Sequence, residues 1–255
     1  MTLCVGIKVK EGLVAIADTR IISGNECISA RKVTVYRENG HRMFVMTSGL
    51  RSARDKALTY FERTLEMHEA PFEYLFQAVN ALAEEVRRVR DEDRKALEES
   101  GLTFNMHTLI GGQLGKDKEH KLYLLYPEGN WVEIGEGTPY QMIGSSSYGK
   151  PVLDRTLKYT DSIDFAFKVG CLAFDSTRIS AADVDYPIDV VLFRQGTDRM
   201  IERRYTETDL KPLSSWWQEH LRELLTRLPG DCLEPFLNEL KANGIPHPPR
   251  DRVPV

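Results

Sequence analysis

The sequence predicts one α+β domain in which two β-sheets are covered by layers of helices. Over the first 50 residues, short apolar or alternating stretches lie between turn signals, which is typical of strands; from Arg51 the apolar period becomes that of amphipathic helices. The order strands, two helices, strands, two helices, strands and a helical end runs on without a linker, an internal repeat or a low-complexity segment. We therefore expect a single domain over residues 1–255, with residues 212–255 as a helical C-terminal extension.

Two hairpins form the predicted N-terminal strands. The first joins residues 2–9 to residues 13–18 around Lys10-Glu11-Gly12, and the second joins residues 32–37 to residues 43–47 around the turn signal Asn39-Gly40. Paired residue numbers then sum to about 22 in the first hairpin and about 79 in the second. The first hairpin therefore places Asp18 diagonally opposite Thr2, and the second places Lys32 opposite Thr47.

The rest of the chain alternates helix and strand patterns. Apolar stripes predict a first helix from Arg51 to Leu65 and a longer one from Phe72, which runs on past Val89 through the charged stretch Arg90–Glu99. Further strands are predicted over residues 108–112, 121–126, 131–134, 140–143, 188–194 and 200–205. Further helices are predicted over residues 148–157, after a cap at Asp161 or Ser162, after a cap at Ser214 as far as Pro229-Gly230, and from Leu233 to Gly244.

Composition and charge exclude several classes of function. The net charge of −4 argues against a general nucleic-acid binder and against a basic membrane-surface protein. We find no apolar run of about 18 residues or more, so no membrane partner is expected. The four cysteines are scattered without a CxxC pair and the six histidines show no metal-binding spacing. These features favour a reduced, cytoplasmic setting and a site that needs no metal.

Thr2 follows the initiator Met1 and opens the first predicted strand. Removal of Met1 would leave a threonine whose hydroxyl and free α-amine belong to one residue, and an α-amine titrates at about 7.7–8.0. Such a threonine is a nucleophile with its own base. The alternative is a small residue that merely follows a start codon, so the hypothesis requires other reactive groups nearby.

Three residues can supply those groups if the two hairpins lie side by side in one sheet. Asp18, Lys32 and Gly49 would then meet Thr2 at one sheet edge. The Lys32 charge would favour the threonine alkoxide, and Asp18 would orient that ammonium group. The backbone N–H of Gly49, at a strand-to-helix turn, could hold an oxyanion. Taken one at a time, the three have simpler interpretations: a turn cap, a solvated strand end and a positive φ angle.

The combination resembles a proteasome β-subunit. The resemblance rests on Thr2, Ala17-Asp18-Thr19-Arg20, Arg31-Lys32 and Thr47-Ser48-Gly49. Within that superfamily, two segments resemble the bacterial ancestral β-subunit group, called Anbu: Met1-Thr2-Leu3-Cys4-Val5-Gly6-Ile7-Lys8 and Tyr148-Gly149-Lys150-Pro151-Val152-Leu153-Asp154-Arg155. The resemblance covers nearly the whole chain and implies a four-layer αββα sandwich of the N-terminal-nucleophile hydrolase type.

The resemblance also implies roles for residues of the site. Thr2 corresponds to the nucleophile, Lys32 and Asp18 to the activating pair, and Gly49 to the oxyanion donor. Ser145 is similar to a serine that supports the threonine amine, and Ser146 is an equally placed candidate.

A second supporting segment of the family, Asp-x-x-Ser, is matched only loosely. The corresponding segment here is Asp183-Val184-Asp185-Tyr186, which lacks the serine. Arg20 is expected to be a structural partner of Asp183.

The function implied is that of a threonine peptidase without a cofactor, which forms an acyl-enzyme on Thr2 after removal of Met1. Its expected partners are a peptide or unfolded-protein substrate and further copies of itself, in a ring or open spiral; an ATPase partner is left open. Two alternatives remain: a non-proteolytic assembly or binding protein that retains the fold, and an amidase with the same nucleophile that acts on a small amide. Cys4 on the first strand could pass for a nucleophile, but a buried, small apolar residue is the favoured interpretation.

Overall fold

The computed structural model describes residues 2–23, 26–37, 40–67, 70–197 and 199–242. Contacts within the chain divide it into two compact units, Met1–Leu210 and Lys211–Val255. The extent of a single domain over the whole chain therefore stays a prediction.

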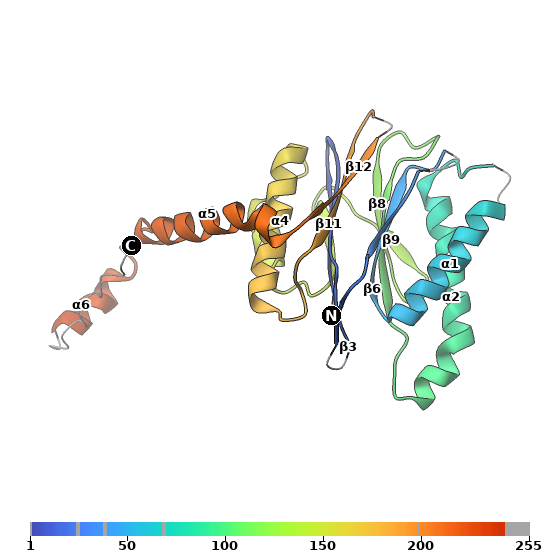
Figure 1. Cartoon of the computed structure of the whole chain (residues 1–255). Coiled ribbons are helices and arrows are strands. Elements are labelled where there is room, and N and C mark those ends of the chain that lie inside the picture. The colour runs from blue at the N-terminus through green and yellow to red at the C-terminus, as the bar shows by residue number, and fades with distance from the viewer. Residues whose placement is uncertain (1, 24–25, 38–39, 68–69, 198, 243–255) are drawn as a thin grey trace. The chain divides into compact units, whose positions relative to one another are not determined.

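The first unit has four layers, helices, sheet, sheet and helices (Figure 1). The first sheet has the order β10-β1-β2-β11-β12, formed by Tyr140–Gly144, Leu3–Val9, Gly12–Asp18, Ile188–Arg194 and Met200–Tyr205. The second has the order β5-β6-β7-β8-β9, formed by Val33–Tyr36, Met43–Gly49, Met106–Gly112, Lys121–Leu125 and Trp131–Glu133. Helices α3 (Lys150–Thr156) and α4 (Ile163–Ser180) cover the first sheet, and α1 (Arg51–Met67) and α2 (Leu75–Glu99) cover the second. This arrangement confirms the predicted α+β fold class, a four-layer αββα sandwich.

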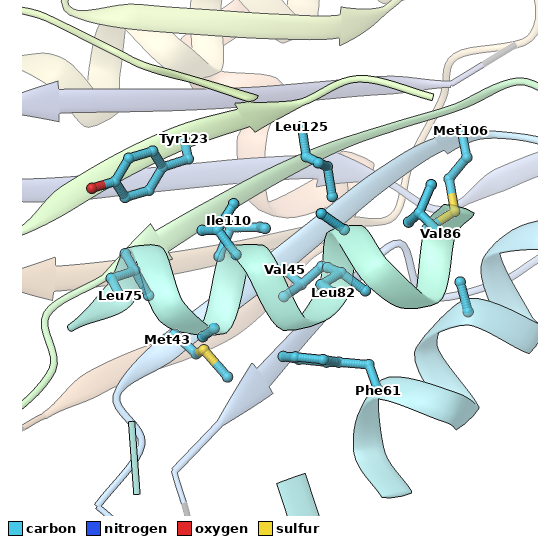
Figure 2. Packing of buried hydrophobic residues seen from close by; sticks show 14 of the residues in the cluster. Met43, Val45, Phe61, Leu75, Leu82, Val86, Met106, Ile110, Tyr123 and Leu125 are labelled. Carbon is cyan, nitrogen blue, oxygen red and sulfur yellow. The ribbon is translucent and has the colours of Figure 1, made fainter. Parts of the chain in front are cut away.

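Apolar side chains fill the space between the layers. Between the two sheets the buried residues include Cys4, Phe44, Leu109 and Phe193. Between the second sheet and its helices, Phe61 and Leu82 pack with side chains of β6, β7 and β8, as Figure 2 shows. Full burial of such a side chain contributes about 1.5–3 kcal/mol. All seven residues of β1 and all seven of β2 are buried, because these strands lie inside the first sheet and are covered on both faces.

The two hairpins have nearly the predicted registers. In the second, Val33 faces Met46 as predicted, and the N–H of Thr47 donates to the carbonyl of Lys32 (3.1 Å). In the first, Cys4 faces Ala17, so the register differs by one position from the prediction and brings Asp18 one position closer to the start of β1. The predicted tip of the second hairpin at Asn39 lies outside the described residues.

Two helices start three or more residues away from their predicted starts. Helix α2 begins at Leu75, so Phe72 precedes it; the side chains of Gln77 and Asp117 accept hydrogen bonds from the first backbone N–H groups. Helix α5 (Glu207–Thr226) begins well before Ser214, because Thr206 and Asp209 bond to each other's backbone N–H groups in a capping arrangement.

The C-terminal unit consists of most of α5 and of α6 (Glu234–Ala242), so both predicted C-terminal helices are present. The predicted end at Gly244 lies outside the described residues. Across the described part of the chain, no helix combines the length and apolarity needed to cross a membrane.

One pair of strands was not predicted. Strands β3 (Arg20–Ser23) and β4 (Glu26–Ser29) form a short, separate two-stranded sheet. It begins two residues after Asp18 and projects at the end of the sandwich where β1 starts (Figure 1).

Candidate active site

A cleft of about 770 Å³ lies at the end of the sandwich where β1 begins. Its walls come from β3, β4, the end of β6, the first turn of α1 and the start of β7. The residues that line it are Thr2, Ile21, Ile22, Glu26, Ile28, Lys32, Thr47, Ser48, Gly49, Leu50, Arg51, Arg54, Asn105, His107 and Gly144. Three of the four residues predicted to be catalytic therefore share one cleft, and the fourth, Asp18, lies behind it.

Asp18 is fully buried at the end of β2. Its Oδ1 accepts the N–H of Leu3 (2.7 Å), and its Oδ2 accepts the N–H of Arg20 (3.1 Å). Because Leu3 is the residue next to Thr2, the first bond holds the start of β1 against the Asp18 carboxylate.

Lys32 directly precedes β5 in the second sheet, and its side chain reaches across to Asp18 at the end of β2 in the first sheet. Its Nζ lies 2.8 Å from Oδ1 and 2.9 Å from Oδ2 of Asp18, and it donates to the carbonyl of Arg20 (2.6 Å). The Lys32 side chain is only 2% exposed although it lines the cleft. Its charge is thus placed in a poorly solvated position next to the start of β1, where electrostatic effects are large.

Two opposing influences act on the pKa of Asp18. Burial raises the pKa of its carboxyl, while the Lys32 charge and the bonds from Leu3, Lys32 and Arg20 act to lower it. The net direction is upward, because the cost of desolvating the carboxylate is the largest of these influences.

Gly49 ends β6, where the chain turns towards α1. Its φ is +120°, and an added Cβ would lie 2.0 Å from the carbonyl oxygen of Asn105. The N–H of the next residue, Leu50, donates to that same carbonyl (2.8 Å). Only glycine fits this turn without strain, which accounts for the residue type. Its role as an oxyanion donor stays a prediction.

Of the two candidate serines, Ser145 is in contact with the backbone of Thr2. Its N–H donates to the carbonyl of Thr2 (2.7 Å), directly after Gly144, which pairs with Leu3. The carbonyl of Ser146 instead accepts the N–H of Lys150, at the start of α3. The structure therefore brings Ser145 to Thr2, while support of the amine by either serine stays a prediction.

Arg20 has a different partner from the one predicted. Its Nη1 lies 2.7 Å from Oδ2 of Asp185, whereas Asp183 was expected in that place. The reason is a contact between distant segments: the N–H and the hydroxyl of Thr19 both donate to the carbonyl of Pro187 (3.1 and 2.7 Å), which draws residues 185–187 alongside Arg20. Asp183 is partly buried and has interactions of its own.

Cys4 is the second residue of β1 and is completely buried. Its thiol donates to the carbonyl of Thr47 (3.7 Å). Burial raises the pKa of this thiol, so the thiolate is strongly disfavoured. This supports the interpretation of Cys4 as a small apolar residue and not a nucleophile. All four cysteines are free.

The proposed meeting of the hairpins at one sheet edge was wrong. The first hairpin belongs to the first sheet and the second to the other sheet, so they stack face to face and are not side by side. Lys32 crosses to Asp18 between the sheets. The residues converge nevertheless, because both hairpins present corresponding ends to the same end of the sandwich.

Several residues of the cleft were not recognised from the sequence. The hairpin β3–β4 contributes Ile21, Ile22 and Ile28, and its signal was the turn pair Gly24-Asn25 between two short apolar runs. Arg54 and His107 also line the cleft. Neither had a signal, since an arginine in a helix and a histidine in a strand carry no functional pattern alone.

Among the described residues, no group of three or more histidine, cysteine or acidic side chains could hold a metal ion.

Comparison with known proteins identifies the family. A model of the proteasome subunit family matches residues 2–188, and the chain therefore belongs to that family. Among curated proteins, a sequence search finds no significant match.

Solved structures narrow the group. The chain is similar to an Anbu (Gly-1) mutant from Hyphomicrobium sp. strain MC1, with 29% identity and a TM-score of 0.82, over 90% of this chain and 98% of that one. It is equally similar to Anbu (ancestral beta-subunit) from Yersinia bercovieri, with 29% identity and a TM-score of 0.82, over 89% and 98% of the two chains. A structure titled as the helical assembly of the Anbu complex from Pseudomonas aeruginosa matches with 26% identity and a TM-score of 0.81, over 89% and 97%. These similarities confirm the predicted resemblance to the Anbu group of proteasome β-subunit-like proteins.

Proposed function

We propose that this chain is a threonine peptidase that hydrolyses peptide bonds through an acyl-enzyme on Thr2 after Met1 has been removed. The observation that carries the proposal is the buried Lys32–Asp18 pair, which is anchored to Leu3, the first residue of β1 and the neighbour of Thr2, and lies beside the same cleft. A lysine held charged beside a hydroxyl favours the alkoxide form of that hydroxyl.

The reaction begins when the hydroxyl oxygen of Thr2 attacks the carbonyl carbon of the scissile bond. The neutral α-amine of the same residue accepts the hydroxyl proton and then delivers it to the leaving nitrogen. The backbone N–H of Gly49 stabilises the oxyanion that forms between these steps. Water, deprotonated by the amine, then attacks the ester carbon, releases the acid product and regenerates the threonine.

The two supporting groups act on this cycle through position. Asp18 orients Lys32 and keeps its ammonium in place, while Ser145 holds the carbonyl of Thr2 and thereby the direction in which the residue points. Because the amine must be neutral, the rate should rise with pH through about 7.7–8.0, the usual range for an α-amine.

We further propose that the chain acts as a homo-oligomer, in a ring or an open spiral, on peptides or unfolded protein. Exposed apolar side chains on α5, just after α5 and on α6 support self-association, since exposed apolar clusters mark interaction surfaces. They are Trp216, Leu221, Leu224, Leu225, Leu228, Phe236, Leu237 and Leu240. Electron microscopy of the purified protein tests the assembly, and a monodisperse monomer would contradict it. A cytoplasmic location stays a prediction.

The decisive experiment is an intact-mass measurement of the assembled protein with and without a peptide epoxyketone. We expect a chain that lacks Met1 and gains one inhibitor mass on Thr2, together with turnover of fluorogenic peptides. Thr2→Ala should abolish both adduct and turnover while the assembly persists. Quantitative retention of Met1 would exclude the free-amine mechanism. An assembled, inert protein would favour the non-proteolytic alternative, and turnover restricted to small amides would favour the amidase.

A further inference from the structure

We propose that Arg54 makes the cleft selective for peptides that carry a carboxylate side chain on the residue before the scissile bond. The inference rests on the proposed function, because it assumes that a peptide lies in the cleft with its carbonyl at Thr2. It deepens that function by naming the class of substrate.

Arg54 lies in the first turns of α1 and lines the cleft together with Lys32, Thr47 and Leu50. Its side chain is 13% exposed, whereas that of Arg51, which lines the same cleft, is 53% exposed. The Arg54 guanidinium is therefore a sheltered cation in the wall of the cleft, and Arg51 is a solvated one.

The partners of Arg54 leave room for a substrate. Its Nε and Nη2 both bond to a single oxygen, Oδ1 of Asp55, at 2.8 and 2.6 Å. Its Nη1 makes a longer bond to the carbonyl of Arg31 (3.3 Å). Asp55 is half exposed, and ion pairs with an exposed partner contribute little to stability. A substrate carboxylate can take over these donors in a bidentate pair, the geometry that guanidinium prefers.

The charge balance of this wall is positive. Asp55 also lies 3.4 Å from Arg51, so one carboxylate serves two guanidinium groups. Lys32 is already matched by Asp18. Glu26 is the one carboxylate among the described residues that line the cleft, and it is exposed on β4. An incoming carboxylate thus meets two guanidinium groups that share one half-exposed carboxylate.

Arg54 and the proposed nucleophile, Thr2, line the same cleft. A peptide whose carbonyl is at Thr2 therefore lies in the cleft whose wall contains the Arg54 guanidinium. The apolar neighbours Leu50 and Ile21 limit solvent around a carboxylate paired with Arg54, which strengthens the pair.

The test compares hydrolysis of three fluorogenic peptides that differ only in the residue before the scissile bond: glutamate, its neutral isostere glutamine, and leucine. For the mature protein we expect kcat/KM for glutamate to exceed that for glutamine by about tenfold or more, as for a charge-assisted pair. Arg54→Leu should reduce this ratio to near one. Arg54→Lys should leave an intermediate ratio, because lysine retains the charge but lacks the two parallel N–H donors of a guanidinium group. Arg51→Leu, which removes a solvated charge from the same cleft, should retain most of the preference.

Two readouts separate this inference from the proposed function. Labelling of Thr2 by an epoxyketone with a leucine side chain should persist in Arg54→Leu, which shows that the variant folds and reacts. In the inert Thr2→Ala protein, fluorescence anisotropy should show tighter binding of an amidated peptide ending in glutamate than of one ending in glutamine, and Arg54→Leu should abolish the difference. Equal hydrolysis and binding of the two peptides, or an unchanged preference in Arg54→Leu, would overturn the inference even if Thr2 proves reactive.

Discussion

Two ion pairs lie beside the cleft, an inner pair of Lys32 with Asp18 and an outer pair of Arg54 with Asp55, and they differ in their surroundings. In the inner pair, Lys32 is 2% exposed and Asp18 is fully buried, and Asp18 accepts further bonds from the backbone of Leu3 and Arg20. In the outer pair, Arg54 is sheltered but its partner Asp55 is 52% exposed. The inner pair is a fixed part of the structure, because loss of either partner leaves a buried group unmatched. The outer pair can open, because water replaces its carboxylate at little cost.

The largest effect should come from breaking the inner pair. We expect Lys32→Ala to lower the free energy of unfolding by about 3–5 kcal/mol, because a buried carboxylate loses its partner. It should also abolish peptide hydrolysis. Urea denaturation and turnover assays measure the two effects, with Thr2→Ala as the control that loses turnover but not stability. A Lys32→Ala protein as stable as the wild type would show that the pair is not structural.

The next effect concerns the turn that connects the two pairs. Gly49 lies between β6, which pairs with the strand after Lys32, and α1, which carries Arg54. We expect Gly49→Ala to cost about 2 kcal/mol or more, since a side chain at φ +120° is strained and its Cβ would meet the carbonyl of Asn105. Gly137→Ala is the matched control, because its Cβ would meet nothing within 4 Å. Equal melting temperatures for the two variants would contradict the expectation.

The pH dependence of stability should distinguish the inner aspartate. Burial raises the pKa of Asp18 above 3.8, so as pH rises through 3.8 the unfolded chain releases its proton before the folded one does. The folded state then binds more protons, and this residue's contribution to stability falls with rising pH up to its folded pKa, by at most about 1.4 kcal/mol per pH unit. Denaturation of wild type and Asp18→Asn between pH 3 and 6 measures it, and parallel curves would contradict it.

The smallest effect should come from opening the outer pair. We expect Asp55→Ala to change the free energy of unfolding by less than about 1 kcal/mol, because Asp55 is half exposed. The same variant should hydrolyse the glutamate peptide faster than the wild type does, since the competing carboxylate is gone. Thermal unfolding and kcat/KM measure the two quantities. A large loss of stability would contradict this expectation and would show that the Arg54–Asp55 pair is as structural as the Lys32–Asp18 pair.

The accuracy of the sequence predictions varied with the distance over which the determining contacts act. The register of the hairpin from Val33 to Met46 was predicted because a tight turn sets it locally. Strands β11 and β12 were predicted with their observed bounds from apolar alternation. Helix α5 was predicted too short, because the capping contact between Thr206 and Asp209 precedes the apolar stripe that marked the helix.

For the candidate site, residue types with a characteristic chemistry could be predicted, but their surroundings could not. Thr2, Asp18, Lys32 and Gly49 stood at strand ends, where turn arithmetic and family resemblance could place them. The Arg20–Asp185 pair could not be placed, because it depends on contacts between segments more than 160 residues apart. The hairpin β3–β4 and Arg54 could not be placed either, because they line the cleft together with residues from distant parts of the chain.

The sequence by itself determined the order of strands and helices, the local registers and the chemical groups available at the start of β1, because these depend on side-chain period and on short turns. Only the tertiary structure decided that the two hairpins stack in different sheets, that Lys32 crosses between them to Asp18, and that Arg54 faces the cleft. The physical reason is that these features depend on which apolar faces bury one another. Burial of that kind joins residues distant in the chain and leaves no local pattern at either of them.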